Sequence, residues 1–192
     1  MTKNGSQNAP FEDLLIVDIG GTIATGYAGK LYADYGARVV NVEPEKGFAT
    51  MRIGPFLANG ESALHGYLHA NKEHVVEGNS LIDHPAIAQA DLVLLDPNSL
   101  PSSLVLEDIS TSVCAISWFG LHGAYAQYQG TDQAIYALTG LMRGVGKPGE
   151  PPVIPTGYHA QILGGVSAFN GSLAHLFGQP DKTSSFFLDA SI

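Results

Sequence analysis

The pair Gly20-Gly21 is the first place in this chain where residue types and spacing suggest chemistry. It lies between an apolar run at residues 14–19 and a segment at residues 24–35 whose apolar side chains recur at helical spacing. Glycines permit a tight turn at dihedral angles that other residues resist. The first turn of a helix offers free N–H groups and the positive end of the helix dipole, which favour an anion. The stretch therefore predicts a phosphate-binding helix start.

Glu43 extends this interpretation to a dinucleotide, because an acidic residue after the second strand of a Rossmann domain binds a ribose. The fingerprint Gly-x-Gly-x-x-Gly is absent, however, and Gly20, Gly21 and Gly26 do not reproduce its spacing. Dinucleotide binding is therefore the weaker alternative. Arg52, in a loop rich in glycine and proline, is a cation available to another phosphate-bearing ligand.

Histidines suggest a second chemistry, metal binding. His65 and His69 are four residues apart, so they can share one helix face, and His74 follows closely. The sequence offers them no convincing carboxylate partner. We therefore expect surface or structural histidines and no metal.

Two residues invite a nucleophilic mechanism. Ser117 lacks the Gly-x-Ser-x-Gly context of a nucleophile elbow. Cys114 alternates within an apolar strand pattern, which indicates a packed small hydrophobe. Taken alone, these residues indicate a domain that binds a phosphate-bearing ligand, and they give no reaction.

The elements that must position these residues alternate along the chain. We expect strands at residues 14–19, 38–42, 75–76, 91–96, 113–119 and 185–191. We expect helices at residues 24–35, 81–90, 100–109, 132–143 and 158–177, and a short helix or strand from residue 64. In the helix at residues 132–143 the buried stripe is expected to be Ile135, Tyr136, Leu138, Leu141 and Met142. Such alternation is typical of an α/β fold with a mostly parallel sheet and flanking helices.

Composition limits the class of protein. With 192 residues, 45% of them hydrophobic and 14% charged, the chain can form a substantial core. A net charge of −9 argues against a nucleic-acid partner, because that needs clustered Lys and Arg. The single cysteine fits a reducing, cytoplasmic compartment, and no apolar run is long enough to span a membrane. Residues 1–10 read as a flexible tail, and a last strand that reaches the final residue suggests part of a longer protein.

A colinear series of motifs resembles class III CoA-transferases, the CaiB/BaiF family that includes formyl-CoA transferase and α-methylacyl-CoA racemase. The matching segments are residues 23–44, Arg52-Ile53-Gly54-Pro55, Asn71-Lys72, Ala90-Asp91-Leu92-Val93, residues 116–125, Gly130-Thr131-Asp132, Gly140-Leu141-Met142 and residues 187–191. The resemblance implies a Rossmann-like large domain over residues 11–192, without the family's second, smaller domain. It also implies coenzyme A or acyl-CoA as substrate, no metal, and an interlocked homodimer or a tandem-fused partner domain. The implied CoA contacts are Thr22, Ile23, Ala24, Arg52, Lys72 and His74.

The catalytic aspartate of the family does not have an acidic counterpart here. Counting from Asp132 reaches Gln161, ahead of Gly164-Gly165, and a one-residue offset reaches Ala160. An amide cannot form the mixed anhydride that this chemistry needs. The next candidate nucleophile is Asp132 itself.

Other family positions are altered as well. The racemase's histidine corresponds to Thr131, and an arginine of the family falls near Asp96, which reverses the charge.

The leading hypothesis is therefore a nucleophile-lacking half of a longer or tandem protein. That protein transfers CoA between small carboxylic acids or acts as a CoA-dependent lyase, and it has no nucleic-acid or membrane partner. The alternative is a non-catalytic acyl-CoA-binding or scaffold module. Sequence beyond Ile192 that repeats the motifs and includes an aspartate before Gly-Gly would favour the enzyme.

Overall fold

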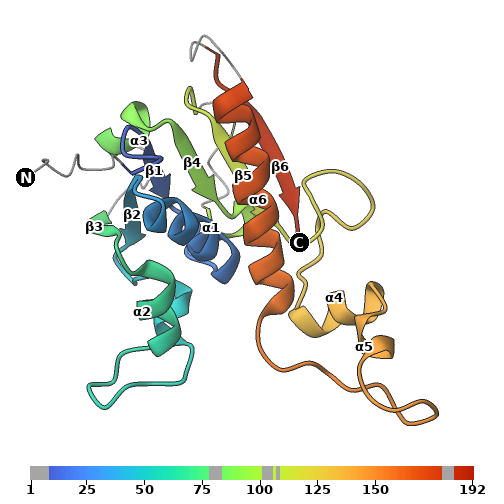
Figure 1. Cartoon of the computed structure of the whole chain (residues 1–192). Coiled ribbons are helices and arrows are strands. Elements are labelled where there is room, and N and C mark those ends of the chain that lie inside the picture. The colour runs from blue at the N-terminus through green and yellow to red at the C-terminus, as the bar shows by residue number, and fades with distance from the viewer. Residues whose placement is uncertain (1–8, 78–83, 101–105, 107–108, 179–183) are drawn as a thin grey trace, which may run out of the picture.

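The computed structural model describes residues 9–77, 84–100, 106, 109–178 and 184–192. Its centre is a six-stranded, all-parallel sheet in the order β3-β2-β1-β4-β5-β6 (Figure 1). This is the strand order of a doubly wound Rossmann fold, whose direction reverses between β1 and β4. The predicted α/β class is therefore confirmed, and the sheet is parallel throughout.

The elements alternate as the sequence predicts. The strands are β1 (Leu15–Asp18), β2 (Arg38–Pro44), β3 (Glu73–Glu77), β4 (Leu92–Leu95), β5 (Val113–Ser117) and β6 (Phe187–Ser191). The helices are α1 (Ile23–Asp34), α2 (Ala63–His69), α3 (Pro85–Gln89), α4 (Asp132–Leu138), α5 (Leu141–Gly144) and α6 (His159–Gly178), with 3₁₀ turns η1 (Ala49–Arg52) and η3 (Pro97–Ser99).

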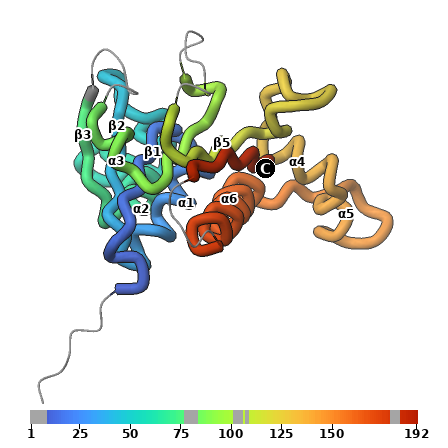
Figure 2. The backbone as a smooth tube through the Cα atoms, turned by 90° about the horizontal axis from the view of Figure 1, so that it is seen from above, coloured from blue at the N-terminus to red at the C-terminus, as the bar shows by residue number. Residues whose placement is uncertain are grey.

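Both faces of the sheet are covered, because successive side chains of a strand point to opposite sides. Ile16 of β1 packs with residues of α1 and α6 on one face, whereas Val17 packs with Ile87 of α3 on the other. Helices α1 and α6 lie along the same face of the sheet, and α4 and α5 lie beyond its β6 edge (Figure 2). Strands buried on both faces explain the continuous apolar runs in the sequence.

Helix α1 begins and ends where the sequence predicts. Thr22 and Thr25 form a reciprocal capping box at its start. Gly36 follows its end with φ 97°, a conformation that favours glycine. The buried hydroxyl of Tyr32 lies 2.8 Å from that of Ser172, which joins α1 to α6. The predicted strand–turn–helix–strand unit is thus confirmed.

Gly165 marks the closest approach of α6 to α1. A Cβ at this position would lie 2.6 Å from the carbonyl oxygen of Ala24, a backbone atom that cannot move without shifting α1. We expect Gly165→Ala to lower the free energy of unfolding by about 1–2 kcal/mol in urea titrations, because overpacking outweighs the gain in helix propensity. In the matched control Gly66→Ala on α2, an added Cβ meets no heavy atom of the described residues within 4 Å. That variant should be unchanged or slightly more stable, and an equal loss in both variants would contradict the prediction.

The predicted helix at residues 132–143 is wrong as a single element. It divides at Gly140, which has φ 77°, into α4 and α5. Ile135 and Tyr136 are buried as predicted, but Leu138 and Leu141 are 71% and 42% exposed. The reason is that these helices lie beyond the last strand of the sheet, so among the described residues no strand lies beneath them (Figure 2).

Other boundaries are refined. The ambiguous segment from residue 64 forms α2 and then β3, and the described part of the helix predicted at residues 81–90 is α3. Most of the turn and helix predicted at residues 100–109, and residues 1–8 of the predicted tail, lie outside the described residues. None of the helices in the described ranges has the length and apolar character needed to cross a bilayer.

Candidate functional site

The glycine turn after β1 is filled by the protein itself. A Cβ on Gly20 would lie 2.4 Å from the Thr25 side chain, and one on Gly21 would lie 2.4 Å from the Phe48 ring. In a dinucleotide fingerprint, glycines leave that room for the pyrophosphate. The packing therefore argues against the dinucleotide alternative and leaves the start of α1, at half-buried Thr22, as the place where a phosphate can approach.

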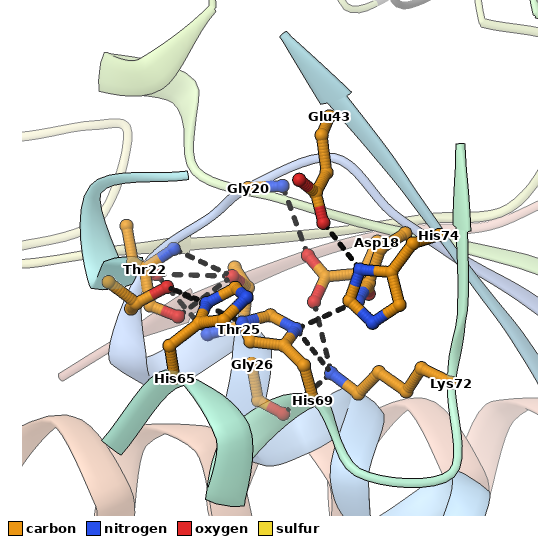
Figure 3. A network of polar contacts seen from close by, with 12 residues as sticks. Asp18, Gly20, Thr22, Thr25, Gly26, Glu43, His65, His69, Lys72 and His74 are labelled. Atoms are coloured by element: carbon orange, nitrogen blue, oxygen red, sulfur yellow. Dashed lines mark hydrogen bonds and ion pairs between the residues drawn. The ribbon is translucent and has the colours of Figure 1, made fainter. Parts of the chain in front are cut away.

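Beneath α1 lies a buried ion pair. Lys72 Nζ is 3.4 Å from Asp18 Oδ2, and both side chains are 0% exposed. The same ammonium donates to the Gly26 carbonyl oxygen at 2.9 Å, and Asp18 Oδ1 accepts from the Gly20 N–H at 3.1 Å (Figure 3). Burial lowers the pKa of Lys72, while the Asp18 carboxylate raises it. The pair therefore links β1, the glycine turn and α1.

A chain of polar contacts continues from Lys72 toward the surface. His69 Nδ1 faces two donors, Lys72 Nζ at 3.5 Å and Asn41 Nδ2 at 2.8 Å. Burial, followed by the charge of Lys72, lowers the pKa of His69 to about 2, so the ring is neutral. We assign its proton to Nε2, which lies 3.5 Å from the Thr50 hydroxyl. Thr50 Oγ1 in turn lies 2.9 Å from His65 Nδ1.

Glu43 and His74 form a second polar contact nearby. Glu43 is 3% exposed, and its Oε1 lies 2.5 Å from Nδ1 of the half-exposed His74 (Figure 3). Sequence reasoning missed this pair. The signal that could have found it is the register of β3 on β2, which pairs Asn41 with His74 and puts Glu43 and His74 on one face.

The residues expected to bind CoA occupy different environments. Thr22, Ile23 and Ala24 form the start of α1, where the Ile23 and Ala24 side chains are buried, so their backbone is what a ligand could reach. Arg52 is exposed at the end of η1 and donates to the Lys46 carbonyl oxygen at 3.1 Å. The structure brings Lys72 and His74 together in the polar cluster, not at the start of α1 (Figure 3).

The carboxyl ends of the strands carry negative charge. Asp18, Glu43 and Asp96 end or follow β1, β2 and β4. Asp96 accepts from the Asn98 N–H at 3.0 Å and the Ser99 hydroxyl at 3.1 Å, and burial raises its pKa. A polyphosphate at this edge would approach the buried Glu43 and Asp96 carboxylates, whereas Asp18 is paired with Lys72.

Gln161 lies in the first turn of α6 and is held by Asp132. Its amide Nε2 donates to Asp132 Oδ2 at 2.8 Å, and the backbone N–H groups of Ala160 and Gln161 donate to Oδ1 at 3.0 and 3.2 Å. The Tyr136 hydroxyl is 3.4 Å from the same Oδ1, and Asp132 is 6% exposed. Asp132 therefore accepts hydrogen bonds from the N–H groups in the first turn of α6, which have no acceptor within the helix. Both of its oxygens are already used as hydrogen-bond acceptors.

An apolar cavity of about 460 Å³ lies beside this helix start. Its lining includes Tyr136, His159, Leu163, Gly164 and Ile192. It joins α4, α6 and the end of β6, at the opposite edge of the sheet from β3 and α2, which carry His65, His69 and His74 (Figure 1).

The other nucleophile candidates are buried. Cys114 is 0% exposed, and burial raises the pKa of its thiol to about 12, so it packs as the small hydrophobe predicted. Ser117 is 5% exposed at the end of β5.

A family model described as CoA-transferase family III matches residues 11–76 and 113–191. The chain is 30% identical over 199 aligned residues to succinate–glutarate CoA-transferase of Agrobacterium fabrum, covering 91% of this chain and 50% of the relative. It is 26% identical to acetyl-CoA:oxalate CoA-transferase of Acetobacter aceti, covering 100% of this chain and 53% of that protein. The chain thus spans about half the length of these curated relatives.

Solved structures show the same fold. A CaiB/BaiF family protein from Brucella suis superposes with a TM-score of 0.80 at 23% identity, covering 96% of this chain and 53% of that one. A protein from Mycobacterium tuberculosis, Rv3272, gives a TM-score of 0.74 at 22% identity, covering 94% of this chain and 54% of that one.

Proposed function

Because this chain belongs to CoA-transferase family III, we propose that it is the nucleophile-lacking half of a protein that handles CoA thioesters of small carboxylic acids. The complete protein transfers CoA between two acids, or acts as a CoA-dependent lyase, with its nucleophile on another part. Relatives named for succinate, glutarate and oxalate support this substrate class.

The observation that carries the proposal is the Gln161 amide at the start of α6. The transfer needs a carboxylate that attacks the thioester and becomes an acyl intermediate. Gln161 donates its amide hydrogen to Asp132 and has no ionisable oxygen. Asp132 is buried and accepts hydrogen bonds on both oxygens, which makes it a poor second nucleophile.

CoA is proposed to bind at the start of α1. Backbone N–H groups at Ile23 and Ala24, the hydroxyl of Thr22 and the guanidinium of Arg52 supply the anion contacts, since the Thr22 N–H already donates to Thr25 Oγ1. We assign Lys72 to the interior, since its ammonium is fully buried against Asp18. His74 contacts Glu43 through Nδ1, so a phosphate would have to approach the Nε2 side of its half-exposed ring.

A partner subunit or tandem-fused domain is proposed to cover the surface formed by α4 and the first turns of α6. Leu138 and Leu163 are 71% and 63% exposed, and Leu163 lines the apolar cavity. Exposed apolar side chains around a cavity are typical of surfaces that another chain or domain covers.

The second candidate is a non-catalytic scaffold that keeps the fold without binding CoA. It is favoured by the Glu43 and Asp96 carboxylates near the carboxyl ends of β2 and β4, because carboxylates repel the phosphates of CoA.

Calorimetry with CoA separates the two candidates. We expect binding at millimolar or lower CoA that Arg52→Ala weakens, whereas Arg143→Ala, an exposed arginine on α5, leaves it unchanged. Absence of binding at millimolar CoA favours the scaffold.

A transfer assay tests the missing nucleophile. With succinyl-CoA as donor and glutarate or oxalate as acceptor, we expect no turnover by this chain and no acyl-enzyme that hydroxylamine can trap. Robust turnover would overturn the assignment of Gln161.

A further inference from the structure

Glu43, His65 and His74 come together from β2, α2 and β3. Each offers one ligand atom, and these atoms lie within 4.8 Å of one another (Figure 3). Ligand atoms of one ion, bound at about 2.0–2.2 Å, lie at most about 4.4 Å apart, so small side-chain adjustments suffice. The fold therefore supplies the carboxylate partner that the spacing of the histidines alone does not reveal.

Thr50 orients His65 for such a role. Its hydroxyl lies 2.9 Å from His65 Nδ1, which leaves Nε2 for a ligand bond. The same hydroxyl lies 3.5 Å from His69 Nε2, and the His65 and His69 rings are 4.3 Å apart. Hydrogen bonds that fix the orientation of a ligating imidazole are usual around protein metal sites. His69 itself is neutral and engaged by Asn41 and Lys72, so it supports the site and is not a ligand.

The charge of the cluster also suits a cation. Asp18 is neutralised by Lys72, whereas the buried Glu43 carboxylate faces imidazoles. A carboxylate at 3% exposure requires a proton-bearing or metal partner to offset its desolvation. The His74 side chain is 40% exposed and gives an ion a path from solvent.

We propose that Glu43, His65 and His74 bind one divalent transition-metal ion, zinc in the first instance. Two imidazole nitrogens and one carboxylate oxygen are a donor set that zinc and other late first-row ions accept. The ion lies between the His74 imidazole and the Glu43 carboxylate, which contact each other directly in this structure, and its remaining coordination position holds water. The proposal rests on this cluster alone and does not depend on CoA binding.

Zinc titration of the tag-free full chain by calorimetry tests the site. We expect one equivalent at micromolar or tighter affinity, and binding weaker by at least about tenfold in His65→Ala and in His74→Ala. The matched control His122→Ala, an exposed histidine outside the cluster, should bind as the wild type does. No binding at millimolar zinc, or equal binding by all four proteins, would overturn the proposal.

Cobalt(II) gives a second readout, because its visible absorption spectrum reports which atoms coordinate the ion. The wild-type chain should show visible absorption bands of a low-symmetry site with nitrogen ligands, and Glu43→Gln should lose them while circular dichroism shows an intact fold. Unchanged bands in Glu43→Gln would exclude the carboxylate as a ligand and overturn the site as proposed.

Discussion

The Lys72→Met variant is expected to lose about 3–5 kcal/mol of unfolding free energy, because it leaves the Asp18 carboxylate buried without its cation. Neither side chain is exposed, so water cannot replace the lost partner. The variant also removes the donor to the Gly26 carbonyl oxygen inside α1. Urea titration followed by circular dichroism measures the loss.

Lys30→Met is the matched control. Lys30 Nζ lies 2.9 Å from Asp34 within α1 and 5.0 Å from the centroid of the Tyr67 ring, and the side chains of Lys30 and Asp34 are 13% and 39% exposed. A helix pair of this kind contributes only about 0.5 kcal/mol. The double variant Asp18→Asn/Lys72→Met should recover part of the loss, because it no longer buries an unpaired charge. Equal losses of unfolding free energy in Lys72→Met and Lys30→Met would contradict the prediction that the buried ion pair contributes more than the helix pair.

The same ion pair explains where sequence reasoning failed on the fold. Residues 14–43 were predictable because apolar side chains fill both faces of β1 and β2. Residues 64–76 gave no clean period because their inward-facing side chains include His69 and Lys72, which a hydrophobicity pattern counts as surface. Because these inward-facing side chains are polar, the hydrophobicity pattern does not reveal α2 and β3.

The site was predictable in part, for a related reason. Local motifs predicted the start of α1, which the structure confirms, because it depends on neighbours in the sequence. The assignment of Gln161 to the family's catalytic position stays a prediction. The contact of Glu43 with His74 joins residues 31 positions apart and depends on strand register. Whether Lys72 faces solvent or Asp18 depends on how α1 and α2 pack over the sheet. Neither could be read from spacing.

The second large effect concerns Gln161, the residue that we propose stands in place of the family's nucleophile. Gln161→Glu is expected to lower the free energy of unfolding at pH 7 by about 2–4 kcal/mol, because a charge-assisted hydrogen bond to Asp132 becomes a repulsion between carboxylates. Two carboxyl groups at this distance share a proton, so the pKa of the pair rises above the ordinary value of about 4.3. The destabilisation is then absent below the unfolded-state pKa and grows as pH rises toward the folded-state value.

Unfolding free energies measured near pH 4 and at pH 7 test this sign. Gln133→Glu is the control: it makes the same change on an exposed residue of α4, next to Asp132, where an acid in the first turn is tolerated. Its stability should follow the wild type at both pH values. A Gln161→Glu deficit that does not shrink in acid would contradict the shared-proton account.

Exchanging the two groups separates the structural requirement from the catalytic one. In Asp132→Asn/Gln161→Asp, the amide oxygen at position 132 still accepts from the backbone N–H groups of residues 160 and 161. The amide hydrogen at position 132 is offered to the new carboxylate at position 161. We expect this double variant to regain most of the stability lost in Gln161→Glu, because each donor again meets an acceptor. It also carries a carboxylate at the position that we propose for the family's nucleophile, so hydroxylamine trapping with succinyl-CoA can then ask whether this chain positions a thioester. A double variant less stable than Gln161→Glu would mean that Asp132 is needed as a charge at the start of α6, and not only as an acceptor.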